Sequence, residues 1–222
     1  MKKLLITIDG PAGAGKTTIS SALADRLSYT YIDTGALYRG VALAARAAGI
    51  DPEDQGGLEG LCRRLHLEFI RTPDQGTRLM LEEKDITDRI RTPEVTMLSS
   101  AVSAKPAVRR FLLGVQRRMG ENKGAVFEGR DMGTVVFPDA DVKFFLDASP
   151  EIRAARRYKE VEGVTGQTLE EVERDLRIRD RNDSSRSLAP LKPAPDAVRI
   201  DSTALSLEAV IDTMLAHIQT RP

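Results

Sequence analysis

The segment Gly10-Pro11-Ala12-Gly13-Ala14-Gly15-Lys16-Thr17 constrains this chain most, because it matches the phosphate-loop pattern G-x-x-x-x-G-K-[ST]. The apolar run Leu4–Asp9 before it predicts a short strand, and apolar residues at helical spacing predict a helix over Lys16–Leu27. A strand, a glycine turn and a helix form the context in which such a loop wraps its N–H groups around an anion. The sequence therefore predicts a fold built around a nucleotide phosphate site.

The loop also assigns chemistry to its side chains. Lys16 is expected to reach the β- and γ-phosphates, and the Thr17 hydroxyl is expected to bind Mg²⁺. A dinucleotide site is disfavoured, because the pattern G-x-G-x-x-G would need glycine where Thr18 stands. The expected ATP contacts are Gly10, Pro11, Ala12, Gly13, Ala14, Gly15, Lys16, Thr17 and Thr18, with Arg157 from a later helix.

Strand-like and helix-like segments alternate along most of the chain. Besides the first strand and helix, the predicted strands are Tyr29–Asp33, Ala125–Glu128, Val142–Leu146 and Ala197–Ile200. The predicted helices are Leu37–Ala48, Pro93–Ala104, Pro106–Met119, one from Ser149 to about Glu162, one from Thr168 to about Asp183, and one after Ser206. This alternation predicts an α/β fold, a parallel sheet of the P-loop NTPase type with helices on both faces.

One stretch departs from the alternation. Leu65–Ile70, Arg78–Glu82 and Lys84–Thr87 have the pattern of short strands around a turn at Asp74-Gln75-Gly76. They predict a small antiparallel insert outside the main sheet.

The charge balance separates classes of ligand. With 33 Lys and Arg against 33 Asp and Glu, the formal net charge is zero, which argues against a general nucleic-acid binder. The cations are 24 Arg and 9 Lys, and arginine suits bidentate recognition of phosphate.

Cys62, the single cysteine, excludes an internal disulfide and fits a reducing compartment. Asp9 interrupts the N-terminal apolar run and no run of about 18 apolar residues occurs, so we expect a cytoplasmic protein without membrane partners. Nothing in the chain demands more than a monomer, so a monomer is expected.

Arginines recur at helical spacing in two segments near the C-terminal end. Arg153, Arg156 and Arg157 share one predicted helix face, and Arg179, Asp183 and Arg186 form a second stripe. The glycine-containing stretch 161–167 between them suggests a hinge. A mobile lid that brings arginines over the phosphates is one interpretation. A solvated helical hairpin is the other, and spacing alone does not decide between them.

Polar residues also follow two predicted strands directly. Asp33-Thr34-Gly35-Ala36-Leu37-Tyr38-Arg39 follows one, and Glu128-Gly129-Arg130-Asp131-Met132-Gly133 follows another. Ligands of open α/β sheets bind at the carboxyl ends of strands, so both segments are candidates for a second substrate site. An ordinary N-cap turn at Thr34 and a strand-ending loop at Gly129 are the alternatives.

Taken together, these segments resemble bacterial cytidylate kinase from end to end. The resemblance rests on the phosphate loop, the Asp33–Arg39 segment, the stretch Gly129-Arg130-Asp131-Met132-Gly133-Thr134-Val135-Val136, and the Arg179 to Leu191 region. It implies transfer of the γ-phosphoryl group of ATP to CMP or dCMP, with Mg²⁺ required. It also implies one kinase chain with a core (1–60, 105–150 and 190–222), an insert that binds the nucleoside monophosphate (about 61–104) and a lid (about 150–187).

The resemblance further implies roles for particular side chains. Thr34, Ser100, Arg109 and Asp131 match positions around the cytosine, with Ser99 and Ser103 as alternatives to Ser100. Arg39, Arg130 and Arg186 match positions that hold the acceptor phosphate, while Arg179 and Asp183 match positions at the ribose and phosphate. The catalytic residues implied are Lys16, Arg130, Arg179 and Arg186.

Two other functions remain possible on the sequence. One is a nucleoside-monophosphate kinase with a different base preference. The other is an ATP-dependent sensor that has lost transfer, whose mark would be missing acceptor-site arginines; Arg39, Arg130 and Arg186 are all present. A GTPase is disfavoured, because the chain has no Asn-Lys-x-Asp-like segment.

Overall fold

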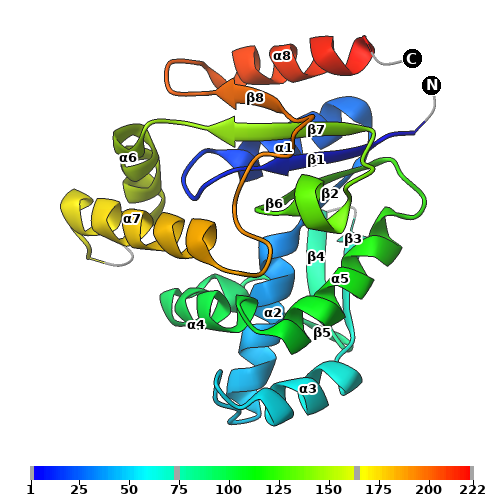
Figure 1. Cartoon of the computed structure of the whole chain (residues 1–222), viewed down its shortest axis with the longest axis vertical. Helices are drawn as coiled ribbons and strands as arrows, with labels where there is room; N and C mark the ends of the chain where they lie inside the picture. Colours follow the sequence, from blue (N-terminus) through cyan, green and yellow to red (C-terminus); the bar gives the residue numbers. More distant parts are fainter. Residues whose placement is uncertain (1–2, 73–75, 163–165, 221–222) are drawn as a thin grey trace. The chain divides into compact units, whose positions relative to one another are not determined.

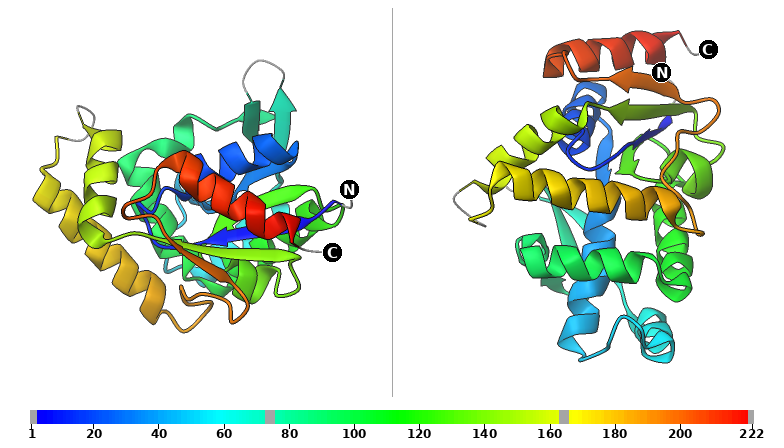
Figure 2. Two further views of the ribbon diagram at one scale, coloured as in Figure 1. Left: turned by 90° about the horizontal axis from the view of Figure 1, so that it is seen from above. Right: turned by 60° about the vertical axis from the view of Figure 1, so that its left-hand side comes forward.

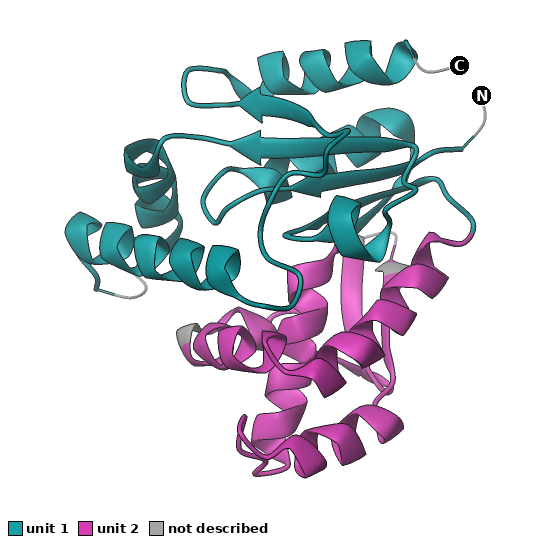
Figure 3. Ribbon diagram, in the orientation of Figure 1, with its two compact units in different colours: residues 1–32, 122–222 teal, residues 33–121 magenta. Residues whose placement is uncertain are grey.

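Figure 1 shows the computed structural model of the chain, which describes residues 3–72, 76–162 and 166–220. The chain divides into two compact units, one made of residues 1–32 and 122–222 and the other of residues 33–121 (Figure 3). These units follow the packing of the chain. The division into core, insert and lid concerns function and stays a prediction.

The first unit contains a five-stranded sheet in the order β2-β6-β1-β7-β8. Its strands are β1 (Leu5–Asp9), β2 (Thr30–Asp33), β6 (Ala125–Gly129), β7 (Val142–Asp147) and β8 (Val198–Asp201). Strand β1 runs parallel to both β6 and β7, and β7 runs parallel to β8. All five residues of β1 are buried, as expected for an apolar strand covered on both faces.

Helices α1 (Lys16–Leu27) and α8 (Leu207–Gln219) pack against this sheet. Their core contains Leu23 and Met214, together with Ile6, Ile8 and Phe144 from the strands. Helices α6 (Pro150–Val161) and α7 (Leu169–Ser185) pack side by side beyond the carboxyl ends of the strands (Figure 2). Each begins at a side-chain cap, Ser149 for α6 and the capping box of Thr168 and Glu171 for α7.

The second unit contains four helices and a three-stranded antiparallel sheet in the order β3-β4-β5. The helices are α2 (Thr34–Ala47), α3 (Gln55–Arg64), α4 (Pro93–Ser103) and α5 (Pro106–Gly120). The strands are β3 (Leu67–Thr72), β4 (Gly76–Leu81) and β5 (Lys84–Asp85), and a 3₁₀ turn covers Arg89–Arg91. Its core contains Leu37, Leu58, Leu79, Val95 and Leu112.

The α/β fold and the antiparallel insert are confirmed, with several local corrections. Helix α2 begins at Thr34 rather than Leu37, because the Asp33 carboxylate caps it by accepting from the N–H of Ala36. Thr34 is therefore the first helical residue and not the cap. Helix α3 was not predicted, since Gly56 and Gly57 in its first turn lower helix propensity. Of the predicted turn at Asp74-Gln75-Gly76, the first two residues lie outside the described residues, and Gly76 begins β4. The centre of the proposed hinge, 163–165, also lies outside the described residues.

The segment after β6 forms a π-helical turn over Met132–Val136, where the sequence predicted only a polar turn or a loop that ends the strand at Gly129. Cys62 is buried in α3, as an apolar role predicts. Among the described residues, no helix is both long and apolar enough to cross a membrane.

Candidate active site at the phosphate loop

The phosphate loop connects β1 to α1 through three glycines with positive φ. Gly10, Gly13 and Gly15 have φ angles of 153°, 77° and 88°. A Cβ on Gly10 would lie 2.0 Å from the carbonyl oxygen of Leu146 in the neighbouring strand β7. Glycine at this position is therefore required by close packing as well as by the turn.

Gly10→Ala is expected to destabilise the protein by more than about 3 kcal/mol, because a strand backbone must move to admit the methyl group. Denaturant unfolding measures this loss. Gly60→Ala is the matched control, since a Cβ there meets nothing within 4 Å inside α3. Alanine favours a helix interior, so the control should stabilise by up to about 1 kcal/mol. Equal free energies of unfolding for the two variants would contradict the packing argument.

Lys16 is the first residue of α1 and is almost fully buried. Its Nζ donates to the carbonyl oxygen of Pro11 at 2.7 Å, so the side chain folds back over the loop. Burial, together with the positive charges of Arg130 and Arg179, lowers the pKa of the ammonium group from 10.5 to about 7, although Glu128 and Asp9 oppose the shift. An anion bound in the loop would reverse this effect, which suits Lys16 to a bound phosphate.

Thr17 lies beside a carboxylate from the neighbouring strand. Its hydroxyl donates to Oε1 of Glu128 at 3.0 Å, and Glu128 is the penultimate residue of β6. Because the hydroxyl proton faces Glu128, an oxygen lone pair of Thr17 remains for a cation. Hydroxyl and carboxylate oxygens are the ligands that Mg²⁺ prefers.

Asp9, the last residue of β1, organises the turn after β6. Its Oδ1 accepts from the N–H of Met132 at 2.9 Å and its Oδ2 from the N–H of Gly133 at 2.8 Å. Burial raises the pKa of this carboxyl group from 3.8 to about 6, although the two backbone hydrogen bonds oppose the shift. The N–H groups fixed by Asp9 directly follow Arg130 and Asp131, so Asp9 determines where the turn presents them.

Arg130, Asp131, Asp183 and Arg186 form one charged cluster. Nε of Arg130 pairs with Oδ2 of Asp183 at 3.0 Å. Arg186 lies 3.6 Å from both Oδ1 of Asp183 and Oδ1 of Asp131. Asp183 thus keeps two guanidinium groups close together. Helix α7 ends at Ser185, so Arg186 lies just beyond the helix instead of continuing its stripe as predicted.

The first arginine stripe differs from the prediction. Arg153 and Arg156 donate to main-chain carbonyl oxygens of the phosphate loop itself, Ala12 and Ala14 respectively. The lid interpretation placed them over the phosphates, but their guanidinium groups bind the loop's own backbone. Arg157 is partly exposed and pairs with Glu160 at 2.7 Å, and its contact with ATP stays a prediction.

The second unit holds the other predicted site residues. Oδ2 of Asp33 pairs with Nη2 of Arg39 at 2.7 Å. A Cβ on Gly35 would lie 3.0 Å from the Arg39 guanidinium, so glycine leaves room for this side chain to fold back along α2. The helix start therefore holds Arg39 in a fixed place.

Thr34 is buried at the start of α2, and Ser100 is exposed on α4. Nη1 of Arg109 donates to the carbonyl oxygen of Ser103 at 3.1 Å, and its guanidinium lies 5.7 Å from the ring centroid of Tyr38. The Tyr38 ring thus supports Arg109, a residue predicted to contact the cytosine, and the sequence did not suggest this role for Tyr38. Among the hydrogen bonds described, Arg109 reaches the main chain of Ser103 and not Ser100.

Comparisons with known proteins identify the family. A family model described as "Cytidylate kinase" matches residues 6–220. The cytidylate kinase of Geobacter sulfurreducens is 51% identical over 98% of this chain and 94% of its own length. That of Pseudomonas fluorescens strain SBW25 is 46% identical over 100% and 97%. The chain belongs to the cytidylate kinase family. It is therefore a kinase, a phosphotransferase, and its family implies ATP as co-substrate.

A solved structure supports the fold of this cytidylate kinase family member independently. The shikimate kinase of Bacteroides thetaiotaomicron has a TM-score of 0.50 over 96% of this chain and 97% of its own, at 13% identity. At that identity the likeness concerns the fold alone, a P-loop kinase sheet with its helices.

Two residues that shape the site of this family member, Asp9 and Asp180, were given no functional role from the sequence. Glu128, Arg153 and Arg156 were named in candidate segments, but their contacts with Thr17 and with the loop backbone were not predicted. The available signal was weak. Asp9 and Glu128 end buried strands, a position that favours function, but their partners lie more than a hundred residues away in the sequence.

Proposed function

We propose that this member of the cytidylate kinase family transfers the γ-phosphoryl group of ATP to CMP and dCMP, giving CDP and dCDP. The observation that carries the proposal is the buried Lys16 of the phosphate loop with the Arg130–Asp183–Arg186 cluster in the same unit. Thr34, Arg39, Ser100 and Arg109 are proposed as CMP contacts on the family resemblance alone. The choice of CMP follows the relatives, which are named cytidylate kinases.

The chemistry needs positioning and charge stabilisation more than proton transfer. An oxygen of the CMP phosphate attacks the γ-phosphorus of ATP in line, and the bond to the β,γ-bridging oxygen breaks. Lys16, Arg130, Arg179 and Arg186 would stabilise the negative charge on the transferring group. The acceptor is already an anionic phosphate, so no strong general base is required. The second candidate function, an ATP sensor without transfer, is disfavoured by the presence of these arginines.

Mg²⁺ is part of the proposal. Thr17 would hold it, beside the Glu128 carboxylate that accepts from its hydroxyl, and the remaining ligands would be ATP oxygens and water. Within the part of the chain that the structure describes, no group of three or more His, Cys, Asp or Glu is arranged as a metal site. Bound Mg²⁺ would neutralise charge on the β- and γ-phosphates.

The substrate assignment is tested by an assay of ADP release with CMP, dCMP, UMP, AMP and GMP as acceptors. We expect CMP and dCMP to be preferred. Higher kcat/KM for UMP or AMP would favour a kinase with a different base preference. ATP binding without turnover of any acceptor would favour the sensor.

Asp131 is proposed to accept a hydrogen bond from the cytosine N4 amino group, which uracil lacks. The side chain is buried and faces Arg186. Asp131→Ala is expected to raise KM for CMP by about 10- to 100-fold while KM for ATP changes little, because a charge-assisted hydrogen bond is lost. The preference for CMP over UMP should fall in parallel. Equal losses for CMP and ATP would contradict this role.

A further inference from the structure

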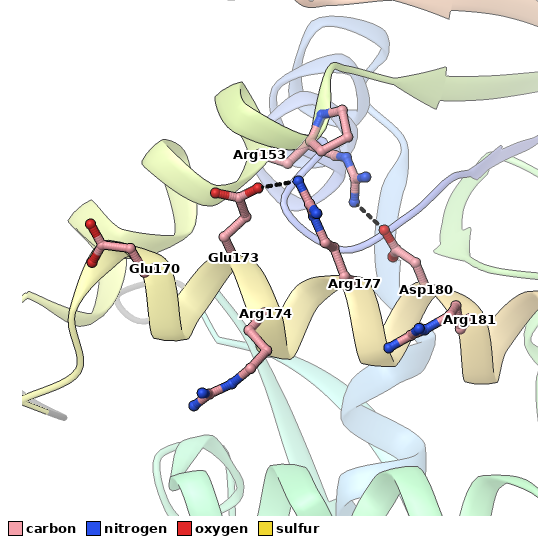
Figure 4. Close-up of a pocket in the computed structure, with 8 residues that line it drawn as sticks. Arg153, Glu170, Glu173, Arg174, Arg177, Asp180 and Arg181 are labelled. Carbon is pink, nitrogen blue, oxygen red and sulfur yellow. Dashed lines mark hydrogen bonds and ion pairs between the residues drawn. The ribbon is translucent and has the colours of Figure 1, made fainter.

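Arg153 is buried where α6 meets the phosphate loop. Its Nε donates to the carbonyl oxygen of Ala148, and its Nη1 donates to that of Ala12, both at 3.0 Å. The same Nη1 pairs with Oδ2 of Asp180 on α7 at 2.5 Å, at the side of a groove between the two helices (Figure 4). One guanidinium group therefore joins the start of α6, the phosphate loop and α7.

The phosphate loop needs such donors. Its N–H groups are directed toward an anion, so carbonyl oxygens of the same peptides point away and require partners of their own. Arg153 satisfies Ala12 and Arg156 satisfies Ala14. A Cβ on Gly13 would lie 2.8 Å from the carbonyl oxygen of Arg153, so the backbone of α6 contacts the loop directly. The loop cannot shift without disturbing α6.

The ion pair connects this support to a proposed catalytic side chain. Asp180 follows Arg179 on α7, and neighbouring helical residues point about 100° apart around the axis. Fixing Asp180 against Arg153 therefore fixes the rotation of α7 and the direction of Arg179. The positive charge of Arg179 contributes to the lowered pKa of Lys16, so the position of Arg179 matters to the phosphate loop.

We propose that Arg153 and Asp180 are positioning residues for phosphoryl transfer, because their ion pair holds α7 and the phosphate loop in the arrangement that places Arg179 near Lys16. The inference rests on the proposed function. Arg153 is 8% exposed and Asp180 22%, and burying such a pair contributes little net stability. A role in fixing the geometry of the site accounts for this buried ion pair, whereas its small net contribution to stability does not.

Asp180→Asn tests the proposal with the least disturbance. Asparagine keeps the shape and one acceptor, and Arg153 keeps both carbonyl partners, but the charge that holds α7 is gone. We expect kcat with CMP and ATP to fall by about 10- to 100-fold, the loss typical of a small misplacement of catalytic groups. KM for CMP should change little. Stability falls because the charge of Arg153 is left unpaired, so the assay is run well below the melting temperature of the variant, where it is fully folded.

Glu173→Gln is the matched control. Glu173 pairs with Arg177 at 2.5 Å on the same helix, but Arg177 is 61% exposed and contacts no loop carbonyl that the structure describes. This variant should keep wild-type kcat. A normal kcat in Asp180→Asn, or an equal loss in Glu173→Gln, would overturn the proposal, as would a loss confined to KM for CMP.

A double-mutant cycle separates joint action from independent effects. Arg153→Lys keeps the positive charge, so it should retain a higher kcat than Arg153→Met. The double variant Arg153→Met with Asp180→Asn should show the same loss of kcat as Arg153→Met alone, because the ion pair is already broken. If Arg153→Met fails to fold, the same comparison is made with Arg153→Gln, which also removes the positive charge. Additive losses would overturn the proposal. If the wild-type enzyme does not phosphorylate CMP, the proposed function is refuted instead. The effect of the ion pair is then measured as the affinity for a non-hydrolysable ATP analogue, which Asp180→Asn should weaken.

Discussion

Turnover is expected to fall by about 10³-fold or more when Lys16 is replaced by methionine, while the nucleotide-free protein becomes more stable. The loss of activity follows from removing the cation proposed to meet the β- and γ-phosphates. The gain in stability follows from removing a buried ammonium group. Steady-state kinetics and denaturant unfolding of the same preparation measure both effects.

The pH dependence gives this prediction a sign. Lys16 has a pKa of about 7 in the folded protein and 10.5 as a free side chain. Each unit of that difference corresponds to about 1.4 kcal/mol, so the buried charge costs a few kcal/mol at or below pH 7. Between pH 7 and 10.5 the unfolded chain binds more protons than the folded one, so wild-type stability rises with pH. The advantage of Lys16→Met should therefore be largest near pH 7 and shrink toward pH 10.

Proton uptake provides an independent measurement. Near pH 8 most of Lys16 is neutral in the free protein, and bound phosphates would favour its charged form. Calorimetry of ATP binding in buffers of different ionisation enthalpy should show uptake approaching one proton for the wild type and none for Lys16→Met. Lys84→Met, at an exposed position of β5, is the control and should behave as wild type. A destabilised Lys16→Met, or no wild-type proton uptake, would contradict the assignment.

The sequence predicted those parts of the molecule that depend on local patterns. Helix α1 has the predicted limits, and the capping signals at Ser149, Thr168 and Ser206 start helices as expected. Each depends on residues within a turn of one another, so spacing alone reveals it. The phosphate loop is likewise local, and its three glycines adopt positive φ.

The remainder required contacts between distant residues. The turn after β6 winds into a π-helix because Asp9 accepts its N–H groups from across the sheet. Arg153 turns to Ala12, which lies 141 residues away. The spacing of the arginines predicts that they share one helix face. It does not predict which part of the chain packs against that face. The sequence therefore found the charged groups of the site and could not tell those directed at substrate from those that support the loop.

Asp183 supports two arginines that are proposed to contact the transferring phosphate, Arg130 and Arg186. Asp183 binds Arg130 and lies beside Arg186, so its negative charge offsets the repulsion between two cations before any substrate arrives. A bound phosphate would add further negative charge to the same place. The arrangement provides fixed positive groups at low cost in the free enzyme, which is the preorganisation that phosphoryl transfer requires.

Arg130→Met is expected to lower kcat/KM for CMP by about 10²- to 10³-fold, since it removes one preorganised cation from the transferring group. Arg130→Lys should recover part of this loss, because it keeps the charge without the planar donors. Arg26→Met is the control, as Arg26 pairs with Glu208 on an exposed surface of the same unit. It should keep wild-type activity.

A second measurement separates a catalytic role of Arg130 from a purely structural one. The charge of Arg130 lowers the pKa of Lys16, so its removal should raise that pKa. More Lys16 is then already protonated near pH 8, and ATP binding by Arg130→Met should take up fewer protons than binding by the wild type. If activity falls but proton uptake is unchanged, Arg130 does not act on the charge at Lys16, and its loss disturbs the turn that Asp9 holds.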